Sequence, residues 1–195
     1  MKLFKSSAVL LIIVCVALIL PVYAQDQNMA EQQKAWMEYM TPGWAHEMMA
    51  EHAGEWTAVT KFWMDPSAPP QIMEGTAKNE MIMGGRYLKS THSGTMMGMP
   101  FEGMSLEGYD NDKKEFTSVW IDNLGTGTSV STGKYDKESK TITYIGNVYD
   151  PMQGKDVKIR QVVKFIDKDH QTIEMYNEMN GQEIKSMEIS LERKM

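Results

Sequence analysis

The sequence predicts an all-β protein, an antiparallel up-and-down β-barrel of about ten strands with an N-terminal helical segment. Beyond Gly54 the chain alternates between strand-like runs and short polar turns such as Asp110-Asn111-Asp112 and Asn180-Gly181. A meander of this length would leave two long edges exposed unless it closed on itself, so we expect a barrel. The predicted strands cover residues 55–64, 71–82, 86–95, 101–109, 115–122, 126–134, 140–148, 156–166, 171–179 and 183–193.

Alternation within the strands predicts which side chains face the interior. In the last strand Met187, Ile189 and Leu191 share one face, as an inward apolar set would. In the strand at 115–122 the shared face is mixed, with Phe116, Ser118, Trp120 and Asp122. Polar groups in an inward phase indicate a wet interior or a ligand pocket. The alternative is that this face points outward.

The first 24 residues have the pattern of a signal peptide. Lys2 and Lys5 precede an apolar run of about 13 residues, which is shorter than a membrane-spanning helix needs. Val22-Tyr23-Ala24 places small residues where signal peptidase cleaves. We therefore expect an exported protein, periplasmic or extracellular, without an integral membrane span after cleavage.

Cleavage would also change the composition of the mature protein. Removing 24 of the 195 residues leaves 171, with 18 basic and 26 acidic side chains, and removes Cys15, the single cysteine. Disulfides and thiolate chemistry are then excluded. The acidic balance argues against a nucleic-acid partner. Nothing in the sequence indicates the oligomeric state.

Residues 25–53 form the predicted helical segment, and residues 54–195 form the predicted barrel domain. Helix formers dominate from Met29 onward, Thr41-Pro42-Gly43 interrupts them, and a second short helix is expected from Trp44 to about His52. Trp36, Met37 and Met40 recur at helical spacing, so we expect this stripe to pack on the barrel.

The start of the first strand resembles the lipocalin and calycin barrels. Gly54-Glu55-Trp56 follows a short helix and matches the G-x-W signature of those proteins. The resemblance implies that Trp56 closes one end of the barrel and that a late basic residue packs on it. Arg193 is in phase with Leu191 and is the expected partner, through a cation–π contact.

A second resemblance covers about residues 45–194. The chain is similar to a bacterial exported family known as a domain of unknown function, placed among calycin-like barrels, which implies the fold but no established activity. The strings that carry it are Phe62-Trp63-Met64-Asp65-Pro66, Gly84-Gly85-Arg86-Tyr87-Leu88, Met97-Gly98-Met99-Pro100-Phe101-Glu102-Gly103, Gly108-Tyr109-Asp110-Asn111, Trp120-Ile121-Asp122-Asn123, Asp150-Pro151-Met152 and Glu174-Met175-Tyr176.

The function expected from this fold is binding of a small, largely apolar molecule inside the barrel. Arg86 or Gln161 is expected to meet a polar group of that molecule. A structural or interaction module with a filled barrel is the alternative. No catalytic motif is present, so enzymatic activity is not predicted. The predicted wall residues are Trp63, Arg86, Tyr87, Met97, Met99, Phe101, Trp120, Gln161 and Met175.

No cofactor is predicted, and two cofactors, haem and Cu(I), are alternatives with candidate ligands in the sequence. Haem held by one histidine is conceivable, with His92 as the candidate because it lies mid-strand in phase with Leu88. The other hypothesis is Cu(I) bound by methionine thioethers, although methionine more often fills irregular core and pocket walls. The methionines concerned are Met96, Met97, Met99 and Met104.

Overall fold

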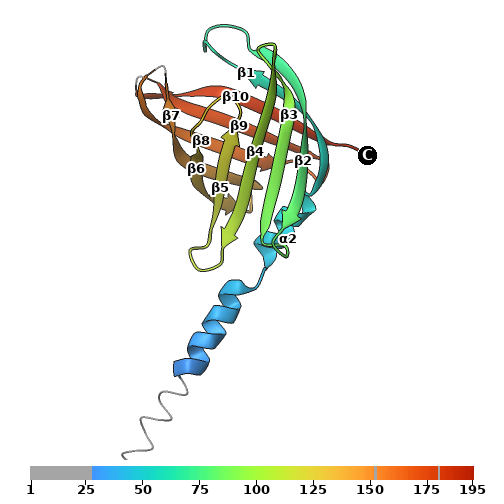
Figure 1. Cartoon of the computed structure of the whole chain (residues 1–195), viewed down its shortest axis with the longest axis vertical. Coiled ribbons are helices and arrows are strands. Elements are labelled where there is room, and N and C mark those ends of the chain that lie inside the picture. Colours follow the sequence, from blue (N-terminus) through green and yellow to red (C-terminus); the bar gives the residue numbers. More distant parts are fainter. Residues whose placement is uncertain (1–27, 152, 180) are drawn as a thin grey trace, which may run out of the picture. The chain divides into compact units, whose positions relative to one another are not determined.

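The computed structural model describes residues 28–151, 153–179 and 181–195 (Figure 1). The predicted signal peptide, with Cys15, lies outside these residues, so export stays a prediction. Met152 and Asn180 also lie outside them. The chain divides into two units, Met1–Thr41 and Pro42–Met195, and each is described by itself.

The described part of the first unit is a helix over residues 28–40. Its aromatic side chains are exposed, and the Trp36 and Tyr39 ring centroids lie 5.9 Å apart. The prediction that this stripe packs on the barrel stays a prediction. Within the described ranges, no helix combines the length and apolar character needed to cross a membrane.

The second unit opens with the helix α2, Trp44–Glu51, which confirms the predicted short helix. Gly43 precedes it, and the Gly43 N–H donates to His46 Nδ1 at 3.1 Å, so this side chain satisfies a backbone donor at the helix start. Ala45 and Met49 are buried against the barrel.

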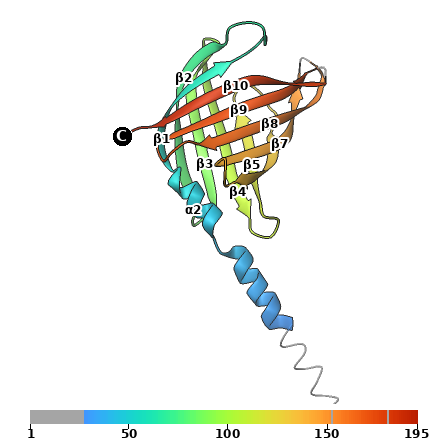
Figure 2. The same cartoon turned by 180° about the vertical axis from the view of Figure 1, so that it is seen from behind.

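Ten antiparallel strands then close into a barrel, as predicted. Each strand pairs with its neighbours in the chain, and β1 pairs with β10 from Trp56–Arg193 to Phe62–Met187 (Figure 2). The strand predicted at 126–134 instead begins at Ser129, since the glycine-containing segment 123–128 forms a loop. The strands are β1 Gly54–Phe62, β2 Gln71–Ile82, β3 Tyr87–Met96, β4 Met99–Asp110, β5 Glu115–Asp122, β6 Ser129–Asp136, β7 Thr141–Asp150, β8 Lys155–Phe165, β9 His170–Met179 and β10 Gln182–Arg193.

Aspartates explain several of the tight turns. Asp110 Oδ1 accepts the backbone N–H groups of Asp112 and Lys113 at 2.9 and 3.0 Å. Asp136 and Asp167 act in the same way at their own turns. Because a short carboxylate side chain can accept hydrogen bonds from backbone N–H groups two and three residues later, these aspartates stabilise the turns between consecutive strands.

The strands alternate direction, so the barrel has two distinct ends. One end carries α2 and the turns that leave β2, β4, β6 and β8. The other, called the far end here, carries the connections that leave β1, β3, β5, β7 and β9. Two buried clusters fill the α2 end: one joins Met49 of α2 to Leu88, Phe116, Ile142, Tyr144 and Val163, and one joins Trp56 to Ala58, Ala77 and Leu191.

Candidate functional site

The inner face of the barrel consists of the side chains that point inward from β1–β10. Directly paired residues on neighbouring strands point to the same side of a sheet. Ser118 pairs with the buried Ser131 on one side and with Glu107 on the other, and Phe116 is fully buried. The mixed face of the 115–122 strand therefore points inward, as the sequence predicted, and the outward alternative is wrong.

On β3, β5 and β9 the burial of inward side chains decreases from the α2 end toward the far end, whereas Val157 and Ile159 of β8, close to the far-end β7–β8 turn, are buried. Inward side chains near α2, such as Ile142 and Leu191, are buried. Inward side chains further along their strands keep partial exposure, among them Phe101, Trp120 and Met175. Protein atoms therefore fill the α2 end itself, while water-sized molecules reach inward side chains of β4, β5 and β9 further along the barrel.

Small residues on the inner face lie beside the partly exposed ones. Ser90 pairs with Ser105, and Ser118 pairs with Ser131, which pairs with Gly146. These short side chains line five consecutive strands, β3–β7. A barrel with a filled interior places large side chains opposite small ones. The space beside these serines and Gly146 is therefore filled either by side chains from the opposite strands or by a bound molecule.

An aromatic group forms the inner surface of β3–β5. The Trp120 ring stacks on Phe101 with centroids 6.4 Å apart, and His92 approaches it edge-on at 5.3 Å. The Trp120 indole N–H donates to Asp122 Oδ2 at 2.7 Å, which fixes the ring. A Cβ at Gly103 would lie 2.6 Å from the Trp120 ring, so a glycine is needed where the indole crosses β4.

Two polar residues of the inner face, Glu107 and Tyr144, lie beside the apolar cluster at the α2 end. Glu107 pairs with Leu88 and Ser118, and no hydrogen bond or ion pair is found for its carboxyl group among the described residues. Burial raises the pKa of Glu107 to about 7. The Tyr144 hydroxyl is buried without a partner, and burial followed by the nearby Glu107 charge raises its pKa well above the usual value.

Sequence reasoning missed Glu107 and Tyr144. The signal that could have found Glu107 was its phase, because residues 101, 103, 105 and 107 alternate with outward neighbours along β4. A glutamate in an otherwise aromatic and small-residue phase is the kind of exception that marks a functional interior. Asn177, also inward, has a buried Oδ1 without a partner.

The structure separates the predicted wall residues into three groups. Phe101, Trp120, Gln161 and Met175 lie on the inner face, where Gln161 pairs with both Tyr144 and Met175. Three lie at the far end: Trp63 just after β1, Met99 opposite Met96, and Met97 in the exposed β3–β4 turn. The remaining two, Arg86 and Tyr87, lie elsewhere.

Arg86 and Tyr87 are at the α2 end and outside the barrel. Arg86 lies in the β2–β3 turn, where its guanidinium donates to the Met83 and Gly84 carbonyls at 3.3 and 3.4 Å. Tyr87 is outward and 42% exposed, and its ring lies across Gly108. The structure does not bring these two residues to the inner face, because a positive-φ turn at Gly84 and Gly85 directs the chain around the barrel rim.

The predicted barrel-closing contact is present. Trp56 is 0% exposed, and the Arg193 guanidinium carbon lies 4.3 Å from its ring centroid. Arg193 also donates to the carbonyls of Glu51, Ala53 and Lys168 at 2.7, 2.6 and 2.9 Å. One side chain therefore joins the end of α2, the start of β1 and the β8–β9 turn.

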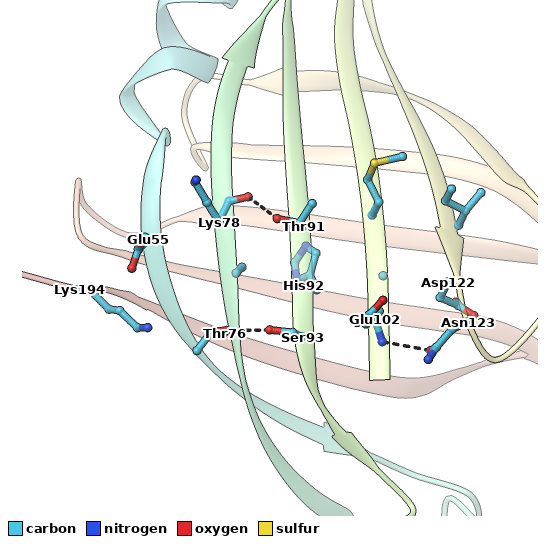
Figure 3. A pocket seen from close by; sticks show the side chains of 14 residues that line it. Glu55, Thr76, Lys78, Thr91, His92, Ser93, Glu102, Asp122, Asn123 and Lys194 are labelled. Carbon is cyan, nitrogen blue, oxygen red and sulfur yellow. Dashed lines mark hydrogen bonds between the residues drawn. The ribbon is translucent and has the colours of Figure 1, made fainter. Parts of the chain in front are cut away.

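A groove of about 640 Å³ lies on the outer face of β1–β5 (Figure 3). It runs between two cross-strand rows of outward side chains. One row is Lys78, Thr91, Met104 and Ile121, and the other is Thr76, Ser93, Glu102 and Asn123.

Several polar groups in this groove are satisfied by one another. Thr76 and Ser93 hydroxyls are 3.0 Å apart, the Thr91 hydroxyl donates to the Lys78 carbonyl, and Asn123 Oδ1 accepts the Glu102 N–H. The inner face, by contrast, holds buried polar groups without partners. None of the buried polar atoms without a partner in the described part of the chain belongs to a residue that lines the groove.

Metal-binding groups are dispersed. Among the described residues, no three His, Cys, Asp or Glu side chains gather as a metal ion would require. Met104 faces outward with Thr91, whereas Met96 and Met99 pair at the far end in the inward phase, so the four candidate thioethers do not share one face.

His92 is the histidine that reaches the inner face beside Trp120. Burial lowers the pKa of His92 to about 4, so its imidazole is neutral, the form that binds a metal. Of the other described histidines, His46 and His52 pack at the α2 end, and His170 is exposed beside Asp167. The haem hypothesis therefore depends on His92.

Comparison with known structures identifies similar barrels. The crystal structure of Rv2717c from M. tuberculosis has a TM-score of 0.60 and 15% identity, over 80% of this chain and 100% of that one. A redesigned β-barrel, b11L5F_LGL, has a TM-score of 0.40 and 13% identity, over 75% of this chain and 95% of that one. At this identity the likeness to Rv2717c shows the fold alone.

Comparison with curated proteins finds no match. A family model described as "Protein of unknown function (DUF1579)" matches residues 41–193, which include α2 and the whole barrel. This β-barrel chain belongs to the DUF1579 family of proteins of unknown function.

Proposed function

We propose that this protein binds a small, largely apolar molecule against the inner face of the barrel, in the half away from α2. The observation that carries the proposal is the partial exposure of inward aromatic and thioether side chains there, chiefly Phe101, Trp120 and Met175. Large apolar side chains that point inward yet stay accessible are the usual lining of a ligand site.

Unpartnered polar groups on the same face support this proposal. The Tyr144 hydroxyl and Asn177 Oδ1 are buried without hydrogen bonds. Each such group costs about 1–3 kcal/mol unless a water or a guest satisfies it. A ligand with a mostly apolar body and one polar group would match both features, and flexible methionines would adapt the lining to its shape.

The competing hypothesis is a structural or interaction module whose barrel is filled by its own side chains. The same part of the inner face decides between the two hypotheses. The clusters around Met49 and Trp56 already fill the α2 end under either hypothesis. The two hypotheses therefore differ in whether a molecule can enter beside Ser118 and Ser131.

Titration with the neutral fluorophore N-phenyl-1-naphthylamine tests the proposal. We expect saturable fluorescence enhancement at one site per chain. Ser131→Leu adds bulk to the inner face and should weaken binding about tenfold, in line with the effect of one misplaced side chain in a pocket. Thr132→Leu, on the same strand but exposed on the outer face, is the matched control and should leave binding unchanged.

Two outcomes would contradict the proposal. One is a lack of saturable binding to the folded wild-type protein, and the other is equal weakening by Ser131→Leu and Thr132→Leu with circular dichroism unchanged. Haemin is added in a parallel titration. A Soret shift that is lost in His92→Ala would replace the apolar molecule with haem as the ligand of the same inner face.

A further inference from the structure

Among inward-phase residues of the described strands, Glu107 is the charged one away from a strand end, whereas Asp122, Asp150, Lys155 and Arg193 lie at strand ends. Glu107 and Asp122 point inward from β4 and β5. Two cationic side chains of the described strands are in the inward phase, and both lie at strand ends. Arg193 covers Trp56 at the α2 end, and Lys155 is exposed at the far end opposite Asp150.

Glu107 is the carboxylate without a partner. Asp122 accepts hydrogen bonds from the Trp120 indole and the Leu124 N–H at 2.7 and 2.9 Å. The Glu107 carboxyl has no hydrogen bond or ion pair among the described residues, and its neighbour Tyr144 has an unpartnered hydroxyl. A half-buried acid without a protein partner beside a buried phenol is costly, and such groups concentrate at functional sites.

Titratable groups around Glu107 carry no compensating charge near neutral pH. These groups are four neutral-form side chains on four elements: Tyr109 on β4, His92 on β3, Tyr144 on β7 and His46 on α2. Burial lowers the pKa of both histidines and raises the pKa of both tyrosines, so all four stay neutral. The Glu107 charge is therefore the one that a ligand would meet at this position.

Aromatic rings extend from this carboxyl group toward the far end. Ser105 lies one inward position beyond Glu107 on β4 and pairs with Trp120, whose ring stacks on Phe101. The faces of aromatic rings attract cations and pack on hydrocarbon. An anion at one end and rings beside it match an organic cation, whereas an acidic ligand would be repelled by Glu107 and Asp122.

We propose that the ligand is a hydrophobic amine, whose protonated nitrogen pairs with the Glu107 carboxylate and the Tyr144 hydroxyl while its hydrocarbon part packs on Trp120 and Phe101. This inference rests on the proposed function and specifies the chemical class of its ligand.

Isothermal titration calorimetry with two matched probes tests it. 1-Naphthylmethylamine carries the cation, and 1-naphthalenemethanol has a hydroxyl group in place of the amino group. Binding that needs ionised Glu107 gains affinity as the pH passes through the pKa of that residue, about 7. Between about pH 6 and about pH 8, the ionised fraction rises about tenfold, and the amine affinity should rise by the same factor.

Variants separate the Glu107 charge from other effects. Glu107→Gln should remove the pH dependence and weaken the amine about tenfold or more at pH 8, while leaving the alcohol unchanged. Glu102→Gln, on the outward side of the same strand, is the control and should match wild type for both probes. Replacing a half-buried, unpaired acid by its amide should not impair folding, so the variant stays informative.

The possible results separate the two proposals. If the amine binds no more tightly than the alcohol, or its affinity is unaffected by Glu107→Gln, the amine inference is wrong and the barrel site stands. If both probes and N-phenyl-1-naphthylamine fail to bind, the proposed function is wrong and the inference falls with it.

Discussion

At the scale of single residues, Glu107 is the least expected feature of the protein. Its carboxyl group points into the barrel beside Leu88 and Tyr144, where it loses part of its hydration without gaining a protein partner. Its raised pKa expresses that cost directly, because a group that prefers its proton in the folded state destabilises that state when it ionises. The residue thus carries a measurable penalty for stability.

Removing the Glu107 carboxylate should stabilise the protein above neutral pH. The folded pKa is about 7 against a usual 4.5, so folded protein retains a proton that unfolded protein has released in that window. Stability should therefore fall by about 3 kcal/mol as the pH rises from 4.5 to beyond 7. Glu107→Gln has no carboxyl group to ionise, so its free energy of unfolding relative to wild type should increase by about 3 kcal/mol over the same pH range.

Urea unfolding at about pH 4 and about pH 8 measures this difference. The exposed Glu102→Gln variant is the control and should show the same offset from wild type at both pH values. An equally constant offset for Glu107→Gln would show that its carboxyl group is solvated.

Sequence phase predicted some residue positions and could not predict others. Arg193 and Trp120 were placed correctly, because period-2 alternation within one strand decides their side. Arg86 lies in a turn, and Tyr87 is the first residue of β3. At such positions the side that a side chain faces depends on where the strand begins, which the sequence does not specify. Unpartnered groups such as the Tyr144 hydroxyl depend on side chains from several strands, and a sequence does not specify that combination.

At the scale of elements, α2 and the barrel act as one unit because Arg193 joins them. Its guanidinium donates to carbonyls at the end of α2, before β1 and in the β8–β9 turn, and it covers Trp56. Carbonyl groups at a helix end lack partners within the helix, so Arg193 satisfies groups that burial would otherwise penalise. The short helix was predictable from Gly43 and Gly54, but this joining role was not.

Substitution of Arg193 by lysine should therefore be costly although the charge is kept. A lysine cannot reproduce the forked donors, and losing them should reduce the free energy of unfolding by about 3 kcal/mol. Arg160→Lys is the matched control. On the outer face, Arg160 donates two hydrogen bonds to Glu183 and lies 3.9 Å from the Tyr176 ring centroid. It joins no separate elements at a buried site, so its replacement should cost less than that of Arg193, about 1 kcal/mol. Equal losses in chemical denaturation would contradict the assigned role of Arg193.

At the scale of the whole barrel unit, the two ends have different tasks. The α2 end holds the buried clusters and supplies stability, while the inner face toward the far end keeps partly exposed aromatic and thioether side chains. The closed meander was predictable because each strand and turn is a local pattern. The space that remains inside depends on the combined volume of inward side chains from all ten strands. Alternation within one strand does not give that volume, so a filled barrel remained the alternative at the level of sequence.

The most direct test of the interior site is a crystal structure with a bromine-labelled 1-naphthylmethylamine, whose anomalous signal locates the molecule. We expect one peak within the barrel beside Trp120, with the amino group directed at Glu107. A peak in the outer groove between Lys78 and Glu102, with the inner face filled by protein side chains, would contradict it.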